Sequence, residues 1–222
     1  MAYPFVFTGK SLIYMSSQKR PRDRLNHAPD KAETALILID VINPIDFEGG
    51  EKLLEHALPL AQSLAVFKRR AKAAKVPVIY VNDNFGRWQA NFPQVVEACL
   101  QTGVPGRAFV ELLQPEEDDY FVLKPKHSAF YQTNLGILLE FLGTDTLVMT
   151  GMATDICVLF SANDAYMRDF HLIIPPDCTA SEESDRHQQA LGLMSRVLKA
   201  EIRCSTEIDF DGTRVINGTR PR

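Results

Sequence analysis

Short apolar runs alternate along the chain with longer amphipathic stretches. The apolar runs predict buried strands at residues 35–39, 76–81, 121–123, 146–149, 171–174 and 202–204. Between them, apolar residues recur every three or four positions, which predicts helices over residues 53–71, 92–100, 135–142, 155–168 and 181–198. Strands that alternate with helices in this way predict an α/β fold, with a doubly wound, mostly parallel sheet and helices on both faces.

The pattern also divides the chain into three parts. Residues 1–34 show weak periodicity and contain three prolines, so they predict an extended arm that lies on the domain or on a neighbouring subunit. Residues 35–210 form the predicted domain, and residues 211–222 form a polar tail that we expect to be frayed. Within the first helical stretch, Pro59 is expected to divide the helix and to begin its longer piece.

Composition narrows the class of protein. The formal net charge of -4 and the single dense basic cluster at residues 19–24 argue against a nucleic-acid partner. No run approaches the roughly 18 apolar residues of a membrane span, and the N-terminus does not resemble a secretory signal, so we expect a cytoplasmic protein. Four cysteines without a CxxC pair suit a reducing compartment, and we expect Cys99, Cys178 and Cys204 to be buried packing residues.

Three chemically reactive residues follow predicted strands. Ligands of doubly wound sheets bind at the carboxyl ends of the strands, where Asp40, Lys124 and Cys157 are expected. Cys157 falls in the first turn of a helix that begins near residue 154 or 155, where the helix dipole stabilises a thiolate. Each residue alone also fits a cap, a solvated lysine or a packing cysteine. Together they predict an acyl-transfer site, because a carboxylate can take the thiol proton while an ammonium group balances negative charge.

The sequence around each of the three residues is recognisable. LIDVINPIDF contains Asp40, VLKPKHSAF contains Lys124 and TGMATDICV contains Cys157. In order and spacing these segments resemble the isochorismatase-like cysteine hydrolases, which include nicotinamidases and N-carbamoylsarcosine amidases, over roughly residues 35–180. The resemblance implies a six-stranded parallel sheet and a catalytic triad of the three residues. It also implies a cis peptide bond between Met152 and Ala153, with an oxyanion hole made by the backbone N–H groups of Ala153 and Cys157.

One departure from the family pattern bears on metals. Nicotinamidases carry a metal site with histidines after the second strand, whereas the corresponding loop here, NDNFGRWQANF, contains none. We therefore expect no catalytic metal and no cofactor. The thiol favours amide chemistry over the vinyl-ether hydrolysis of true isochorismatases, which needs no thiol. The sequence thus predicts a metal-independent cysteine amidohydrolase for a small carboxamide or ureido compound, assembled as a homodimer or homotetramer.

Residues near the three reactive side chains are candidates for substrate binding. Small-molecule sites are mostly apolar with a few polar groups for orientation. The candidates are Asn84, Phe85, Arg87, Trp88, His127, Phe130 and Thr154. The aromatic residues would form the walls of the pocket, and the polar residues would hold the substrate. Thr154 would either contact the substrate or cap the helix. For the aromatic residues, ordinary packing is an equal alternative, as is an exposed position for His127. The other four histidines are expected to be structural or solvated; they are His27, His56, His171 and His187.

Other functions remain open from the sequence. A non-amide hydrolase of the vinyl-ether type would use the same fold. A nucleotide- or flavin-binding module would need a glycine-rich turn after the first strand, where residues 40–44 read DVINP instead. A non-catalytic scaffold that binds a ligand or partner is the third alternative, and the reactivity of Cys157 toward iodoacetamide distinguishes it from an enzyme.

Overall fold

A computed structural model describes residues 31–86 and 91–216. Arg87, Trp88 and most of the expected N-terminal arm lie outside the described residues. The sheet runs in the order β3-β2-β1-β4-β5-β7, and all of its neighbouring strands are parallel. Its strands are β1 (Thr34–Ile39), β2 (Val78–Asp83), β3 (Tyr120–Lys124), β4 (Thr146–Met152), β5 (His171–Ile174) and β7 (Glu201–Ile202), and the two-residue β6 (Thr179–Ala180) also pairs with β4. The expected doubly wound α/β architecture is confirmed.

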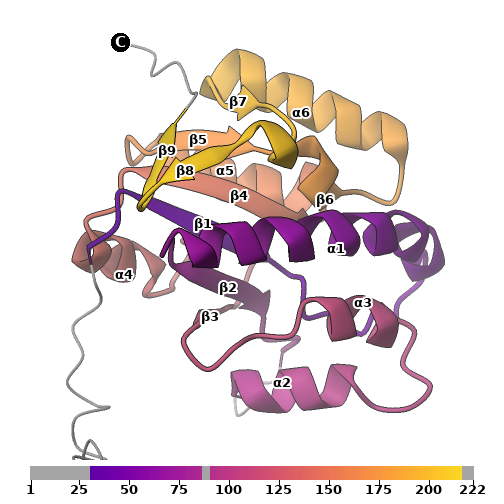
Figure 1. Cartoon of the computed structure of the whole chain (residues 1–222). Helices are drawn as coiled ribbons and strands as arrows, with labels where there is room; N and C mark the ends of the chain where they lie inside the picture. The colour runs from indigo at the N-terminus through magenta and orange to yellow at the C-terminus, as the bar shows by residue number, and fades with distance from the viewer. Residues whose placement is uncertain (1–30, 87–90, 217–222) are drawn as a thin grey trace, which may run out of the picture.

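Helices cover both faces of this sheet (Figure 1). One face packs against α1 (Gly50–Ala73), α2 (Phe92–Cys99) and α3 (Arg107–Leu112). The other packs against α4 (Leu135–Leu142), α5 (Leu159–Tyr166) and α6 (Ser184–Leu198). β1 is buried along its whole length because both of its faces are covered, which explains its uninterrupted apolar sequence. The sheet is therefore the rigid middle layer from which the candidate residues project.

Several elements differ from the sequence prediction. α1 continues through Pro59 without a break. Leu53 and Ala57 before the proline, and Leu60 and Leu64 after it, are all buried on the same core, and this packing outweighs the one backbone hydrogen bond that proline removes. The short helix α3 was not predicted, since six residues are too few to show helical periodicity.

The C-terminal part of the domain also differs from the prediction. Residues 211–216 were expected to belong to a frayed tail, but most of them are in a hairpin of β8 (Asp209–Asp211) and β9 (Arg214–Ile216). The hairpin is tied to the start of β1, because the N–H of Thr34 donates to the carbonyl of Thr213 at 3.0 Å. Cys204, just before the hairpin, is exposed and not a packing residue as expected. These strands are too short to give a clear alternating pattern in the sequence.

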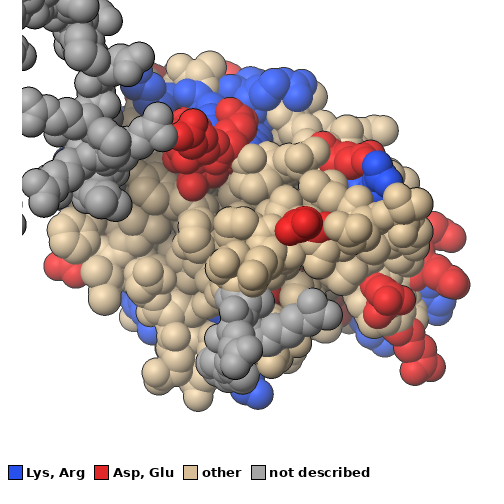
Figure 2. Space-filling view, turned by 90° about the horizontal axis from the view of Figure 1, so that it is seen from below, with Lys and Arg blue, Asp and Glu red and all other residues tan. Residues whose placement is uncertain are grey.

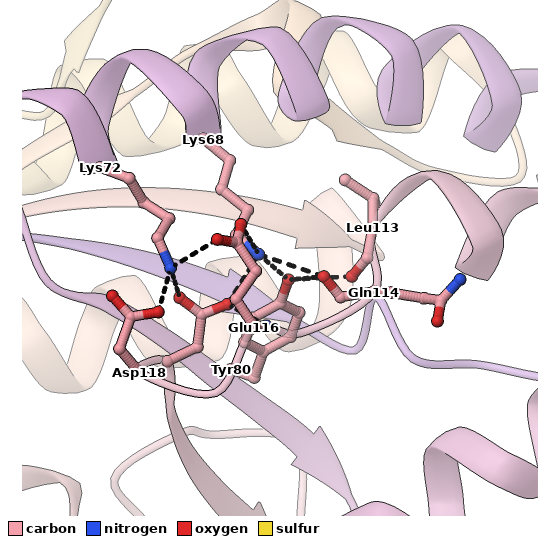
Figure 3. Close-up of polar contacts among 8 residues, drawn as sticks. Lys68, Lys72, Tyr80, Leu113, Gln114, Glu116 and Asp118 are labelled. Atoms are coloured by element: carbon pink, nitrogen blue, oxygen red, sulfur yellow. Dashed lines mark hydrogen bonds and ion pairs between the residues drawn. The ribbon is translucent and has the colours of Figure 1, made fainter. Parts of the chain in front are cut away.

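A buried ionic network fixes the chain before β3 (Figure 3). Lys68 Nζ of α1 lies 2.6 Å from Asp119 Oδ2 and donates to the Tyr80 hydroxyl at 3.0 Å. Tyr80 in turn donates to the carbonyl of Leu113 at 2.9 Å, and Lys72 lies 2.9 Å from Asp119 Oδ1. Because the network holds the segment that leads into β3, it fixes the position of the strand that ends at the candidate site.

Uncharged side chains cover much of one face of the molecule. Figure 2 shows this face from below, with an acidic side chain near its middle and basic and acidic side chains close together near its upper edge. Among residues 31–86 and 91–216, none of the helices combines the length and apolarity that crossing a membrane requires.

Candidate active site

The candidate residues meet where the strand order reverses. From β1 the chain continues to β2 and β3 on one side, and β4, on the other side of β1, starts the second half of the sheet (Figure 1). In open α/β sheets this switch point is where ligands bind. Gly151 of β4 has a φ of +106°, and a side chain there would meet the Ile39 carbonyl oxygen at 2.0 Å. Only glycine allows β4 to pass so close to the end of β1.

Lys124 joins the other two reactive residues. Its Nζ lies 2.8 Å from Asp40 Oδ2 and 3.5 Å from Cys157 Sγ. Lys124 is fully buried, Asp40 is 6% exposed and Cys157 is half-buried. The other Asp40 oxygen, Oδ1, accepts the backbone N–H of Asp83 at 2.7 Å, and Asp83 Oδ2 lies 3.8 Å from Lys124 Nζ. The structure thus places the three predicted residues in one contiguous set of ionic and hydrogen-bond contacts.

Burial and mutual charge shift the pKa values of all three side chains. Burial raises the pKa of Asp40, and the Lys124 cation only partly opposes it. Burial would lower the pKa of Lys124, but the negative charge of Asp40 and its hydrogen bond to Lys124 outweigh this effect, so the pKa of Lys124 is raised. Burial and the Asp40 charge raise the pKa of Cys157 to about 12, although Lys124 acts in the opposite direction. The raised pKa of Cys157 favours a thiol that shares its proton with Asp40 over the thiolate that a helix N-terminus alone predicts.

The turn that carries Cys157 has an unusual backbone. The peptide bond between Met152 and Ala153 is cis, the bond for which the family resemblance implies this geometry. Thr154–Val158 then forms a π-helical turn before α5, and the N–H of Val158 donates to the Ala153 carbonyl at 3.1 Å. The expectation that Thr154 or Asp155 caps the helix is wrong, because no side-chain cap bond is made. Their side chains are instead engaged by the segment around α6.

Thr154 and Asp155 each bind a residue that sequence reasoning left out of the site. The hydroxyl of Thr154 lies 2.9 Å from His187 Nδ1. Ser181 Oγ donates to Asp155 Oδ1 at 2.6 Å. Neither His187 nor Ser181 carries a sequence signal, because the contacts span 33 and 26 residues.

The other described candidates lie at different depths. His127 Nδ1 lies 3.7 Å from Cys157 Sγ, and its ring packs against Phe160 at a centroid distance of 5.6 Å. Phe85 is 41% exposed on the loop after β2. Phe130 is 7% exposed and packs in the core with Phe170, so it is a core residue.

The loop after β2 is partly described. Asn84 is buried and accepts the N–H of Gly86 at its own Oδ1, so its side chain stabilises the loop backbone. Asp83 was not among the predicted residues, although it ends β2 and the rule that selected Asp40 and Lys124 applies to it equally. Within the described part of the chain, no group of three or more histidine, cysteine or acidic side chains is arranged to hold a metal ion.

Several known proteins are similar to this chain in sequence. A family model described as the isochorismatase domain matches residues 34–206. An uncharacterised isochorismatase family protein, YaaI of Bacillus subtilis, is 40% identical over 178 residues, which cover 80% of this chain and 97% of YaaI. The ureidoacrylate amidohydrolase RutB of Methylobacterium radiotolerans is 31% identical over 74% of each chain.

Solved structures also match. N-carbamoylsarcosine amidase from Thermoplasma acidophilum superposes with a TM-score of 0.59 at 26% identity, over 80% of this chain and 99% of that one. The pyrazinamidase/nicotinamidase of Streptococcus mutans gives a TM-score of 0.61 at 28% identity, over 76% and 99% of the two chains.

Proposed function

The chain belongs to the isochorismatase family, and from this premise we propose that it is a metal-independent cysteine amidohydrolase that cleaves a C–N bond of a small carboxamide or ureido compound. The observation that carries the proposal is the contact set in which Lys124 Nζ lies within 3.5 Å of both Asp40 and Cys157. The similarity to a ureidoacrylate amidohydrolase, a nicotinamidase and an N-carbamoylsarcosine amidase supports the same reaction class.

The proposed reaction begins with proton transfer. Asp40 takes the proton of Cys157, with which it already shares a hydrogen bond, and Lys124 stabilises the thiolate that forms. The thiolate attacks the substrate carbonyl, and the backbone N–H groups of Ala153 and Cys157 hold the developing oxyanion. The amine leaves with the proton from Asp40. Asp40 then takes a proton from the water that attacks the thioester carbonyl; as the C–S bond breaks, Asp40 returns this proton to the sulfur, and the acyl group leaves as the acid product.

The protonated resting state fits this sequence of steps. Because the pKa of Asp40 is raised by burial, the carboxyl accepts a proton more readily than an exposed aspartate does. A thiol with a pKa of about 12 does not persist as a free thiolate at neutral pH. The nucleophilic thiolate is therefore generated when Asp40 takes the proton, at the moment of attack.

Further parts of the proposal rest on the sequence. Independence from a catalytic metal is supported by the loop after β2, which has no histidine over residues 82–92. Dialysis against a chelator is therefore expected to leave the rate unchanged. The homodimeric or homotetrameric state, the cytoplasmic location and the small-molecule substrate, with no cofactor and no nucleic-acid or membrane partner, are predictions of the same proposal.

Ammonia release from a panel of small amides, ureas and carbamoyl compounds tests the proposal. Cys157→Ala and Cys157→Ser are expected to lose activity by more than about a thousandfold, because the nucleophile is removed. Cys204→Ser is the matched control, since it alters an exposed thiol away from the site. Circular dichroism checks that each variant is folded. An unchanged rate in either Cys157 variant overturns the assignment of the nucleophile.

A further inference from the structure

Two of the three residues between the cis peptide bond and the nucleophile, Thr154 and Asp155, are held from outside the turn. Thr154 is fully buried, and its hydroxyl lies 2.9 Å from His187 Nδ1 in α6. Asp155 makes a reciprocal pair with Ser181, the residue after β6. Ser181 Oγ donates to the carboxylate at 2.6 Å and accepts the Asp155 N–H at 3.3 Å. We call these contacts of Thr154 and Asp155 with His187 and Ser181 the α6 clamp.

The clamp acts on a segment that has little stabilisation of its own. The π-helical turn Thr154–Val158 begins without a side-chain cap. Turns of this type are rare in proteins and are frequently found at functional sites. Cys157 follows Thr154 by three residues, and its Sγ lies 3.5 Å from Lys124 Nζ. A small rotation of the turn would therefore lengthen this contact. Reaction geometry tolerates little displacement of this kind, since about 1 Å of misplacement can slow a reaction a hundredfold.

We propose that His187 and Ser181 are positioning residues that hold the nucleophile-bearing turn in its reactive orientation through Thr154 and Asp155. The proposal rests on the function proposed above. It assigns a catalytic purpose to the segment from β6 to α6, which otherwise only covers the sheet.

The surroundings of His187 suit this purpose. A neutral imidazole keeps the bond in either tautomer, because a threonine hydroxyl both donates and accepts. Burial lowers the pKa of His187, and the charge of His56 lowers it further. The negative charge of Asp155 opposes this shift only in part, so the imidazole ring is neutral at neutral pH. The ring also lines a pocket of about 240 Å³ between α1 and α6, together with His56 and Asp177. The clamp is therefore reached by solvent from the side that faces α1.

The test measures the alkylation of each cysteine by iodoacetamide in the intact chain at pH 7, followed by peptide mass spectrometry. His187→Ala, Thr154→Val and Ser181→Ala are expected to slow alkylation of Cys157 by about tenfold. His187→Asn is expected to recover most of the rate, because its amide lies near the position of Nδ1. The double variant T154V/H187A is expected to be no slower than the slower single variant, since both changes remove one bond.

His171→Ala is the matched control. His171 makes a bond of the same length, 2.9 Å, to Glu201, on strands remote from the turn. A loss of stability alone would affect both histidine variants, whereas the clamp predicts slower alkylation only in H187A. An unchanged or faster rate in H187A, or no recovery in H187N, overturns the proposal.

Amide hydrogen exchange separates this proposal from the proposed function. The clamp predicts faster exchange over residues 152–160 in H187A and no such change in H171A, whether or not Cys157 is a nucleophile. If the cysteine variants retain activity while exchange responds as expected, the amidase mechanism is wrong and the clamp stands. If the cysteine variants are inactive and exchange in H187A equals that of the native protein, only the clamp is wrong.

Discussion

The ion pair between Lys124 and Asp40 is expected to contribute to the stability of the fold as well as to the chemistry. Lys124 is fully buried and Asp40 is 6% exposed, and their charged atoms lie 2.8 Å apart. Lys124→Met preserves the length of the side chain but leaves a buried carboxylate without its cation. Breaking a buried pair in this way costs about 3–5 kcal/mol. For a domain of this size the cost corresponds to a fall in Tm of about 10 °C.

A double-mutant cycle isolates the pair from the other effects of each substitution. Asp40→Asn alone leaves a buried cation, whereas K124M/D40N leaves no unpaired charge, so the double variant is expected to be more stable than the sum of the single effects predicts. The expected coupling free energy is about 2–3 kcal/mol, measured by urea denaturation at pH 7. The exposed pair of Arg107 and Glu111, 2.7 Å apart, is the control and should couple by only about 0.5 kcal/mol.

The pH dependence provides a second check on the same variant. Burial already raises the pKa of Asp40 above its value in the unfolded chain, and loss of the Lys124 cation raises it further. Between the unfolded and folded pKa values the folded state binds more protons, so stability falls as pH rises through this interval. The deficit of K124M should therefore be smaller at pH 5 than at pH 8. A deficit that does not depend on pH, or single effects that simply add, would refute the reasoning.

Three further predictions concern the scaffold, each measured by urea denaturation. Asp119→Asn should lower the free energy of unfolding by about 3 kcal/mol, because the Asp119 side chain is only 2% exposed within the ionic network. Asp118→Asn should lower it by less than about 1 kcal/mol, because the Asp118 side chain is 77% exposed. Equal losses in the two variants would show that burial does not set the difference. Gly151→Ala should prevent folding, because the added Cβ would lie 2.0 Å from the carbonyl oxygen of Ile39 in β1. Gly192→Ala should stabilise α6 by about 0.5–1 kcal/mol, because a Cβ there meets no atom within 4 Å. A stable G151A variant would contradict the close approach of β4 to β1. Tyr80→Phe should cost about 1–3 kcal/mol, and no loss would mean that the hydrogen bonds of its hydroxyl with Lys68, Leu113 and Gln114 contribute nothing net.

The sheet was predictable because its strands are buried on both faces. A strand such as β1 shows in the sequence as an unbroken apolar run, and a polar residue after it marks the carboxyl edge of the sheet. This reasoning predicts that Asp40 and Lys124 lie at the same edge of the sheet. Short elements such as β6 and the β8–β9 hairpin were not predictable, because two or three residues show no periodicity and form through contacts with distant parts of the chain.

The site was predictable in its reactive residues but not in its energetics. The raised pKa of Cys157 depends on burial and on the proximity of Asp40, and neither can be read from the residues around the cysteine. The bond between Thr154 and His187 is likewise a product of the fold. From the sequence, Phe130 was as well suited to lining the substrate pocket as to packing in the core, and in the structure its ring packs in the hydrophobic core. Arg87 and Trp88 remain predicted substrate contacts.

The central position of β1 affects how the protein is made. Among the strands of the described residues β1 is synthesised first, yet it pairs with β4 in a register that joins Leu38 to Thr150, about 110 residues later. At the usual speed of translation, roughly 5–20 seconds pass between the appearance of the two strands. During this interval an apolar strand edge has no native partner on one side. Synthesis of this domain therefore includes a period of exposure to aggregation, during which a ribosome-associated chaperone would protect the nascent chain.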